Sequence, residues 1–413
     1  MTNDGTVFYF RSNKDAPRYK IVRYDLSKPE EGFVDIVPQA EDVLRSSLVV
    51  YKDKLVLKYM HDVKSVLLVH DLKSGKFLNE IPIPIGTIDS VAGRRVDDEI
   101  FILFTSFLDA SAIYHYNFTT KDEEQRLSVF KRATVANFDA DLFVVKQVFY
   151  ETKDGTKIPM FVAHKKDIVL DGNSPVYLYG YGGFSNPIEA SYYPSDIVFM
   201  QNFGGVIAYA NLRGGGEYGE EWHKAGMLLN KQNVFDDFQY AAKYLIKEKY
   251  TRPGRISIYG GSNGGLLVGA CVNQAPELFG AAVVNVGVMD MLRFHKFTIG
   301  HAWQSDFGKP DENKEDFENL LRYSPLHNVS TAHPYPPVAL FTSSHDDRVV
   351  PLHSYKYIAE LQHTAGPLTS NPLLIRVDTK AGHGAGKPID KQIAESTDRF
   401  SFIATALDIE WRD

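Results

Sequence analysis

One short glycine-rich segment carries the residue types of a serine nucleophile. Residues 260–265 read Gly-Gly-Ser-Asn-Gly-Gly and contain the pattern Gly-x-Ser-x-Gly centred on Ser262. The segment follows a predicted strand, 255–260, and precedes a helix-compatible run, 266–271, which is the context of a sharp strand–turn–helix elbow. Side chains beside the serine would clash in so tight a turn, which accounts for the glycines. The elbow would place the Ser262 hydroxyl at a helix N-terminus, where backbone N–H groups face a developing anion.

Two later loops supply the other residue types that a serine nucleophile needs. A serine hydroxyl is a poor nucleophile at neutral pH unless a base takes its proton. Behind an elbow of this kind the acid and then the base follow the serine along the chain. Asp346 and His383 each follow a predicted apolar strand, and His383 lies between glycines. We predict that His383 is the general base and that Asp346 orients it, with Asp347 as the alternative acid.

A second glycine motif suggests different chemistry. Gly214, Gly216 and Gly219 match the spacing of a dinucleotide-binding loop and follow a predicted strand. Such a loop needs an acidic residue about 20 positions later at the end of the next strand. The acidic candidates, Asp236 and Asp237, fall instead within a predicted amphipathic helix. We therefore do not expect a nucleotide cofactor, and because a His-Glu-x-x-His pattern and clustered cysteines are missing we expect no catalytic metal.

The part of the chain that carries these motifs, 139–413, alternates apolar strands with helices. The clearest helix is expected over 233–249, where apolar residues recur on one face. Continuous apolar strands separated by helices predict a mostly parallel sheet with flanking helices. The strands are expected at 174–181, 205–212, 255–260, 280–288, 337–343 and 372–378.

The part that precedes them, 1–138, reads as short strands with a repeat. A strand ends in a similar turn sequence at Asp25, Asp71 and Asn117, so the repeat is 46 residues long. A period of this length is typical of a four-stranded β-propeller blade. The segment has room for about three blades, whereas propellers usually close with four to eight. We therefore expect an incomplete β-propeller.

The amino-acid composition and net charge argue against several classes of function. The 413 residues carry a net charge of −7, are 44% hydrophobic and 23% charged, and include one cysteine, Cys271. No basic tract suggests nucleic-acid binding. A single cysteine excludes an intrachain disulfide and suggests a reducing, cytoplasmic location. We expect no signal peptide and no membrane-spanning segment, and we expect a monomer.

Five motifs together resemble the prolyl oligopeptidase (prolyl endopeptidase) family. They are Tyr-Gly-Tyr-Gly-Gly-Phe at 179–184, Asn-Leu-Arg-Gly-Gly-Gly-Glu-Tyr-Gly at 211–219, Gly-Ser-Asn-Gly-Gly at 261–265, His-Asp-Asp-Arg-Val at 345–349 and Ala-Gly-His-Gly-Ala-Gly-Lys at 381–387. The resemblance implies an α/β-hydrolase fold behind the propeller and a serine peptidase that cleaves short peptides after proline.

The resemblance also implies roles for individual residues. Ser262, Asp346 and His383 would form the triad, and the oxyanion hole would be the Asn263 N–H and the Tyr181 hydroxyl. Arg348 would hold a substrate carbonyl. The proline pocket would be formed by Phe184, Asn263, Val288, Trp303, Phe307 and Val349, with Trp303 stacked on the proline ring. Phe307 stands where the family usually has tyrosine.

The resemblance leaves alternatives open. Relative to the family, the chain resembles an N-terminally truncated form, because it starts inside the propeller. An active peptidase with proline-containing peptides as partners is the main expectation. The other two are another α/β-hydrolase, such as an esterase or related peptidase, and an inactive product that only binds peptides.

Overall fold

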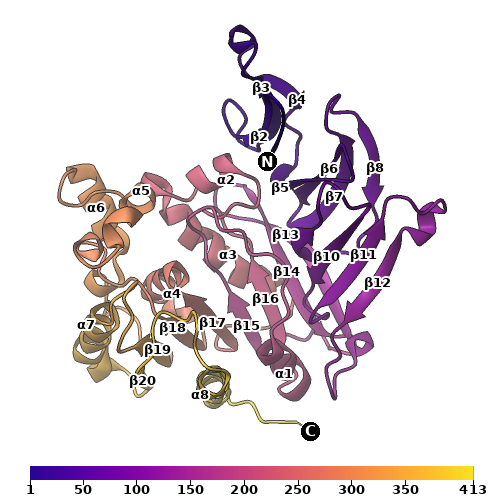
Figure 1. Ribbon diagram of the computed structural model, residues 1–413. Helices are drawn as coiled ribbons and strands as arrows, with labels where there is room; N and C mark the ends of the chain where they lie inside the picture. The colour runs from indigo at the N-terminus through magenta and orange to yellow at the C-terminus, as the bar shows by residue number, and fades with distance from the viewer. Residues whose placement is uncertain (413) are drawn as a thin grey trace. The chain divides into compact units, whose positions relative to one another are not determined.

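The computed structural model describes residues 1–412, which divide into two compact units. The first unit comprises residues 1–140 with two short later segments, 189–193 and 217–221, and the second comprises the remainder of the described chain. In Figure 1 residues 1–140 of the first unit run from indigo to purple, and its two later segments share the magenta and rose colours of the second unit.

Three four-stranded antiparallel sheets make up the first unit. The sheets are β1 (Thr2–Asp4), β2 (Val7–Ser12), β3 (Lys20–Asp25) and β4 (Val34–Val37); β5 (Val43–Val50), β6 (Lys54–His61), β7 (Lys64–Asp71) and β8 (Phe77–Ile81); and β9 (Thr87–Ala92), β10 (Glu99–Thr105), β11 (Ala112–Asn117) and β12 (Leu127–Arg132). Asp25, Asp71 and Asn117 each end the third strand of their sheet. The 46-residue repeat therefore marks one blade per period, and the prediction of about three blades is confirmed.

Neighbouring blades bury apolar side chains against each other. One buried cluster joins Ile21 and Val37 of the first blade to Leu55 and Leu57 of the second. Another joins the second and third blades. A blade of this kind cannot bury its apolar faces alone, so its core is shared with its neighbours.

An eight-stranded sheet forms the centre of the second unit. Its strand order is β13-β14-β16-β15-β17-β18-β19-β20. The strands from β16 to β20 pair in parallel, and β13 and β14 add an antiparallel edge. The strands are β13 (Phe143–Glu151), β14 (Lys157–Lys165), β15 (Val176–Tyr179), β16 (Val206–Ala210), β17 (Ile256–Gly261), β18 (Ala281–Asn285), β19 (Val338–Ser343) and β20 (Leu373–Asp378). The predicted mostly parallel sheet is confirmed.

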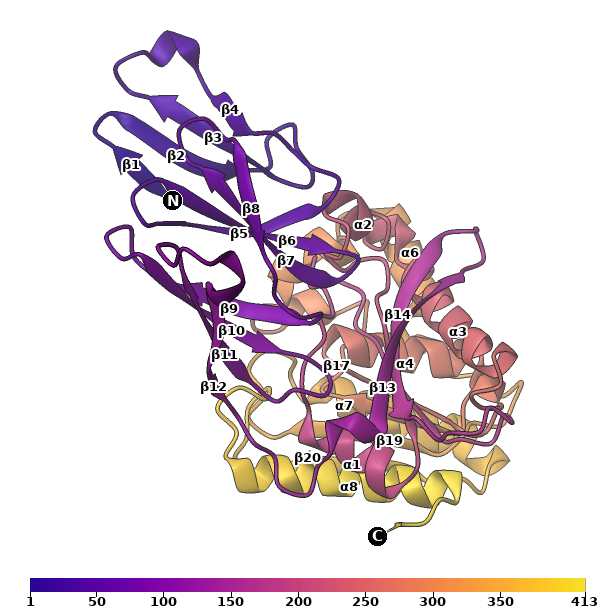
Figure 2. The same cartoon turned by 90° about the vertical axis from the view of Figure 1, so that its right-hand side faces the viewer.

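Helices cover both faces of this sheet. On one face Tyr177 of β15 contacts Phe199 of α1 and Phe400 of α8. Figures 1 and 2 both show these two helices close together. On the other face Leu178 joins a cluster with α3 and α4. The α-helices are α1 (Pro194–Asn202), α2 (Glu220–Lys224), α3 (Gln232–Lys247), α4 (Asn263–Gln274), α5 (Gln304–Phe307), α6 (Lys314–Tyr323), α7 (Leu352–Glu360) and α8 (Ile389–Leu407).

The predicted helix over 233–249 is α3, displaced by one or two residues. Sequence periodicity did not predict β13 and β14. The carboxyl ends of β15, β17, β19 and β20 lead into the loops that carry the predicted site residues. Parallel pairing brings these ends to one edge of the sheet.

Candidate active site

Ser262 lies at the turn between β17 and α4 in a strained backbone conformation. Its φ is 59° and its ψ is −116°, a region that residues other than glycine rarely adopt. A Cβ on Gly260 would lie 2.3 Å from the Gly264 carbonyl oxygen, and one on Gly264 would lie 2.7 Å from the Gly180 carbonyl oxygen. The Ser262 N–H donates to the Asn285 carbonyl at 2.9 Å. The sequence therefore folds into the predicted elbow because only glycine fits two positions before and two positions after the serine.

A buried carboxylate follows β19 and holds a histidine that follows β20. The Oδ2 atom of Asp346 lies 2.7 Å from Nδ1 of His383. Its Oδ1 atom accepts hydrogen bonds from the backbone N–H groups of Arg348, at 3.0 Å, and Val349, at 2.9 Å. Asp346 is 3% exposed, whereas the alternative acid, Asp347, is exposed. The carboxylate that contacts His383 is therefore Asp346, and not the exposed Asp347.

Ser262 and His383 are not hydrogen-bonded to each other in the described part of the chain. His383 occupies the loop between β20 and α8, with Gly382, Gly384 and Gly386 around it. A Cβ on Gly384 or Gly386 would meet no atom within 4 Å. The loop is therefore open to solvent on the C-terminal side of the histidine, whereas on the N-terminal side a Cβ on Gly382 would lie 3.8 Å from the His345 carbonyl oxygen.

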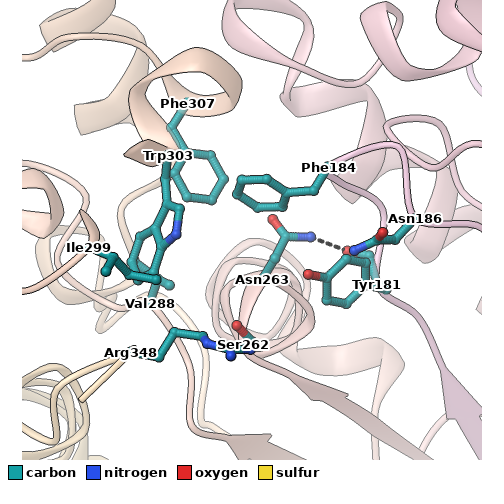
Figure 3. A pocket seen from close by; sticks show the side chains of 10 residues that line it. All are labelled: Tyr181, Phe184, Asn186, Ser262, Asn263, Val288, Ile299, Trp303, Phe307 and Arg348. Atoms are coloured by element: carbon teal, nitrogen blue, oxygen red, sulfur yellow. Dashed lines mark hydrogen bonds between the residues drawn. The ribbon is translucent and has the colours of Figure 1, made fainter. Parts of the chain in front are cut away.

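Ser262 opens onto a cavity of about 280 Å³. In Figure 3 the rings of Phe307, Trp303 and Phe184 lie in the upper part of the view, and Ser262 and Arg348 lie below them. The residues that line the cavity are Tyr181, Phe184, Asn186, Ser262, Asn263, Val288, Ile299, Trp303, Phe307 and Arg348. The lining combines aromatic rings with the polar side chains of Asn186, Asn263 and Arg348, so the cavity suits one apolar side chain of a substrate together with its neighbouring peptide groups.

Aromatic rings form the apolar wall of this cavity. Phe184 and Phe307 meet edge to face with their centroids 5.3 Å apart. Phe294 packs edge to face on Phe307 at 5.3 Å and lies parallel to Trp303 at 6.4 Å. Trp303 and Phe307 come from consecutive short helical turns that end in α5. Three ring contacts thus hold the wall in one arrangement.

Two hydrogen-bond donors lie beside the serine. The Asn263 N–H is at the first position of α4, and its side-chain Nδ2 donates to the Tyr181 carbonyl at 2.6 Å (Figure 3). Burial raises the pKa of the Tyr181 hydroxyl, against a smaller opposite effect of a hydrogen bond with Asn186. The Tyr181 hydroxyl therefore keeps its proton and can donate it to an anion.

The structure brings most of the predicted residues to one place. Tyr181, Phe184, Ser262, Asn263, Val288, Trp303, Phe307 and Arg348 all line the cavity. Val349 is buried beside Asp346 and is not among the lining residues. The lining also includes Asn186 and Ile299, which sequence analysis missed. Asn186 lies two positions past the 179–184 motif, so a longer motif window was the only available signal.

Other types of site have little support in the described residues. No group of three or more His, Cys, Asp and Glu side chains between residues 1 and 412 could hold a metal ion. Asp237 was one of the two acidic candidates for the second glycine motif. It lies within α3, and its carboxylate pairs with Arg213 at 2.6 Å. No helix of that same range is both long and apolar enough to cross a lipid bilayer.

The sheet, the elbow and the order of serine, aspartate and histidine define an α/β-hydrolase fold. Two family models match: "Prolyl oligopeptidase family" over residues 191–410, and "Prolyl oligopeptidase, N-terminal beta-propeller domain" over residues 1–128. The chain belongs to the prolyl oligopeptidase family.

Individual relatives agree with the family models. Prolyl oligopeptidase A of Galerina marginata is 44% identical over 100% of this chain and 55% of the relative. Prolyl endopeptidase of Dictyostelium discoideum is 44% identical over 98% of this chain and 54% of the relative. The solved structure of prolyl oligopeptidase B from Galerina marginata, bound to a 35mer hydrolysis and macrocyclization substrate, superimposes with a TM-score of 0.95 at 41% identity. The superposition covers 100% of this chain and 58% of the solved chain. The chain thus spans about half the length of the curated relatives it matches.

Proposed function

We propose that the chain is a serine peptidase that hydrolyses short peptides on the carboxyl side of proline. The observation that carries this proposal is the pairing of His383 with buried Asp346 at 2.7 Å, in the same unit as a serine that opens onto an aromatic cavity. The names of the relatives support the substrate class. Carrying it to this chain is our inference.

In the proposed reaction, Ser262 Oγ attacks the carbonyl carbon of the proline residue while His383 takes the hydroxyl proton. Asp346 keeps the proton of neutral His383 on Nδ1, so that Nε2 is free to accept. The carbonyl oxygen becomes an oxyanion that accepts hydrogen bonds from the Asn263 N–H and the Tyr181 hydroxyl. His383 then protonates the leaving amine, and water hydrolyses the acyl-enzyme with His383 again as base. The proton transfer requires His383 Nε2 to lie within hydrogen-bond distance of Ser262 Oγ in the complex with the substrate.

The cavity gives the proposed specificity. The proline ring is rigid and apolar, and it would stack on Trp303 between Phe184 and Phe307. Arg348 is exposed at the cavity and would hold a carbonyl of the residue before proline. We also propose a cytoplasmic location, because the only cysteine, Cys271, is a buried free thiol, and a monomeric state.

The test is hydrolysis of a short fluorogenic peptide with proline before the leaving group. Ser262→Ala should lower kcat by about 10⁴–10⁶, because the triad acts as a unit. Circular dichroism must show that both proteins are folded. A matched peptide with alanine in place of proline separates the alternatives, since an esterase or another peptidase would not prefer proline. A folded chain that binds the proline peptide without cleaving it would overturn the proposal in favour of a peptide-binding product.

A further inference from the structure

Lys231 is a buried cation that the proposed reaction does not use. It lies between a short turn of 3₁₀-helix, Leu228–Asn230, and α3, and only 1% of its surface is exposed. Burying an ammonium group is unfavourable unless hydrogen bonds replace its water shell. Burial lowers the pKa of Lys231 to about 8, although the negative charge of Asp306 opposes this effect. A lysine kept in such a place needs an explanation.

The ammonium group contacts the segment that carries both proposed oxyanion donors. Its Nζ atom donates to the Asn263 Oδ1 atom at 3.0 Å and to the Gly182 carbonyl at 2.9 Å. The other end of the Asn263 side chain donates to the Tyr181 carbonyl at 2.6 Å. Lys231, Asn263 and the backbone of residues 181–182 therefore form one hydrogen-bonded network.

The packing around this network leaves little freedom. A Cβ on Gly182 would lie 2.2 Å from a methyl carbon of Val234, and one on Gly183 would lie 2.7 Å from the Asn263 amide nitrogen. The Lys231 Nζ atom also lies 5.3 Å from the centroid of the Phe307 ring, in the wall of the cavity. The same cation thus touches the donor segment and the aromatic wall.

We propose that Lys231 is a positioning residue that aligns the Asn263 and Tyr181 donors of the oxyanion hole. Charge-assisted hydrogen bonds to Asn263 and Gly182 hold the two donor segments at a fixed separation. The positive charge also favours the negative charge that develops on the substrate oxygen. This inference rests on the proposed function, because it concerns the transition state of that reaction.

Other charged groups close to this site are Asp306 and His223. Asp306 is 2% exposed, and its carboxylate contacts His223 Nε2 at 2.5 Å and the Phe184 N–H at 3.4 Å. Asp306 favours the protonated form of Lys231. Lys231 is therefore charged below about pH 8 and loses its charge above it. The alignment of the donors should weaken over the same range.

The test compares two ligands of the full chain. A short peptide aldehyde that ends in prolinal forms a hemiacetal with Ser262, and its oxygen takes the oxyanion position. The matching amide is the same peptide ending in pyrrolidine in place of prolinal, so it fills the cavity but lacks the carbonyl that Ser262 attacks and forms no oxyanion. Lys231→Met should weaken binding of the aldehyde by about 10- to 100-fold and binding of the amide by less than about threefold. Lys231→Gln, which keeps a hydrogen-bond donor but no charge, should show an intermediate loss.

Lys309→Met is the matched control, because Lys309 follows α5 at the cavity wall but is exposed and pairs with Glu312. It should leave both affinities unchanged. Equal losses of aldehyde and amide binding in Lys231→Met would overturn the proposal, because they would indicate a general role in packing. So would unchanged aldehyde binding. Peptide hydrolysis by Lys231→Met also separates a positioning role from a packing role. For a positioning role kcat should fall by about 10- to 100-fold and KM should change little.

The wild-type protein provides a test that needs no folded variant. Its preference for the aldehyde over the amide should fall between pH 7 and pH 9.5, and a constant preference over this range would overturn the proposal. The outcomes also separate this inference from the proposed function. A folded wild-type chain that neither cleaves the proline peptide nor binds the aldehyde rejects the proposed function. A wild-type chain that does both, beside an unaffected Lys231→Met, rejects only the role of Lys231.

Discussion

Asp346 uses its two carboxylate oxygens for different tasks. Oδ1 accepts the N–H groups of Arg348 and Val349, and Oδ2 contacts Nδ1 of His383. An asparagine at this position can keep its carbonyl oxygen on the two N–H groups, but its NH₂ group then faces His383. The histidine would have to present a lone pair at Nδ1 and carry its proton on Nε2. In that tautomer it cannot accept the serine proton.

We therefore expect Asp346→Asn to lower kcat for the proline peptide by about 10³–10⁴ while the fold is retained. Steady-state hydrolysis at pH 7 measures the loss, and circular dichroism checks the fold. Asp347→Asn is the matched control, because Asp347 is exposed and should stay within about twofold of wild type. A comparable loss in the control would mean that the triad acid is assigned to the wrong residue.

At the scale of elements, the elbow depends on close approach between β17 and α4. We expect Gly260→Ala to destabilise the protein by about 1–3 kcal/mol and to reduce activity, because its Cβ would meet backbone atoms that cannot move independently. Gly261→Ala is the control, since its Cβ would lie 3.6 Å from the nearest atom, in ordinary contact. Urea unfolding and peptide hydrolysis measure both effects. Equal stability of the two variants would contradict this account of the turn.

The elements that sequence predicted best are those with the most uniform burial. β17, β18 and β19 read as continuous apolar runs because helices cover both of their faces. β14 was missed although nearly all of it is buried, and it contains Pro159, which argues against a strand. β13 lies at the sheet edge with mixed burial and gives no clear period.

The residues of the candidate site also differ in how well they can be predicted from the sequence. Ser262, Asp346 and His383 could be predicted because an elbow and two loops after strands restrict where they occur. The cavity residues came from motifs, since periodicity alone cannot distinguish a pocket aromatic from a core aromatic. Lys231 could not be predicted, because a lysine at the start of a helix usually faces water. Only the packed structure reveals that this one is buried.

At the scale of the whole molecule, two buried groups affect stability in opposite directions as the pH falls. Burial raises the pKa of Asp196 to about 6, against the Tyr209 hydrogen bond, and lowers the pKa of His353 to about 4, against the charge of Asp290. Between about pH 6.5 and pH 4 the folded state binds the Asp196 proton more tightly than the unfolded state and binds the His353 proton less tightly. Acidification thus stabilises the fold through Asp196 and destabilises it through His353. Each effect is about 3 kcal/mol, so they nearly cancel.

Asp196→Asn should remove this compensation. We expect its free energy of unfolding to fall between pH 7 and pH 4 by about 3 kcal/mol more than that of the wild type. Urea unfolding at the two pH values measures the difference, and the comparison with wild type cancels the contribution of all other carboxylates. The same pH dependence in both proteins would mean that Asp196 does not take up a proton on folding in this range.

The backbone of Ser262 has a consequence for how such a chain can change over generations. A left-handed conformation at a non-glycine residue costs about 1–3 kcal/mol, which glycine would largely avoid. Selection for folding stability alone would therefore favour glycine at position 262, which would remove the hydroxyl. A serine at this position thus costs stability that the proposed catalytic use of its hydroxyl would explain.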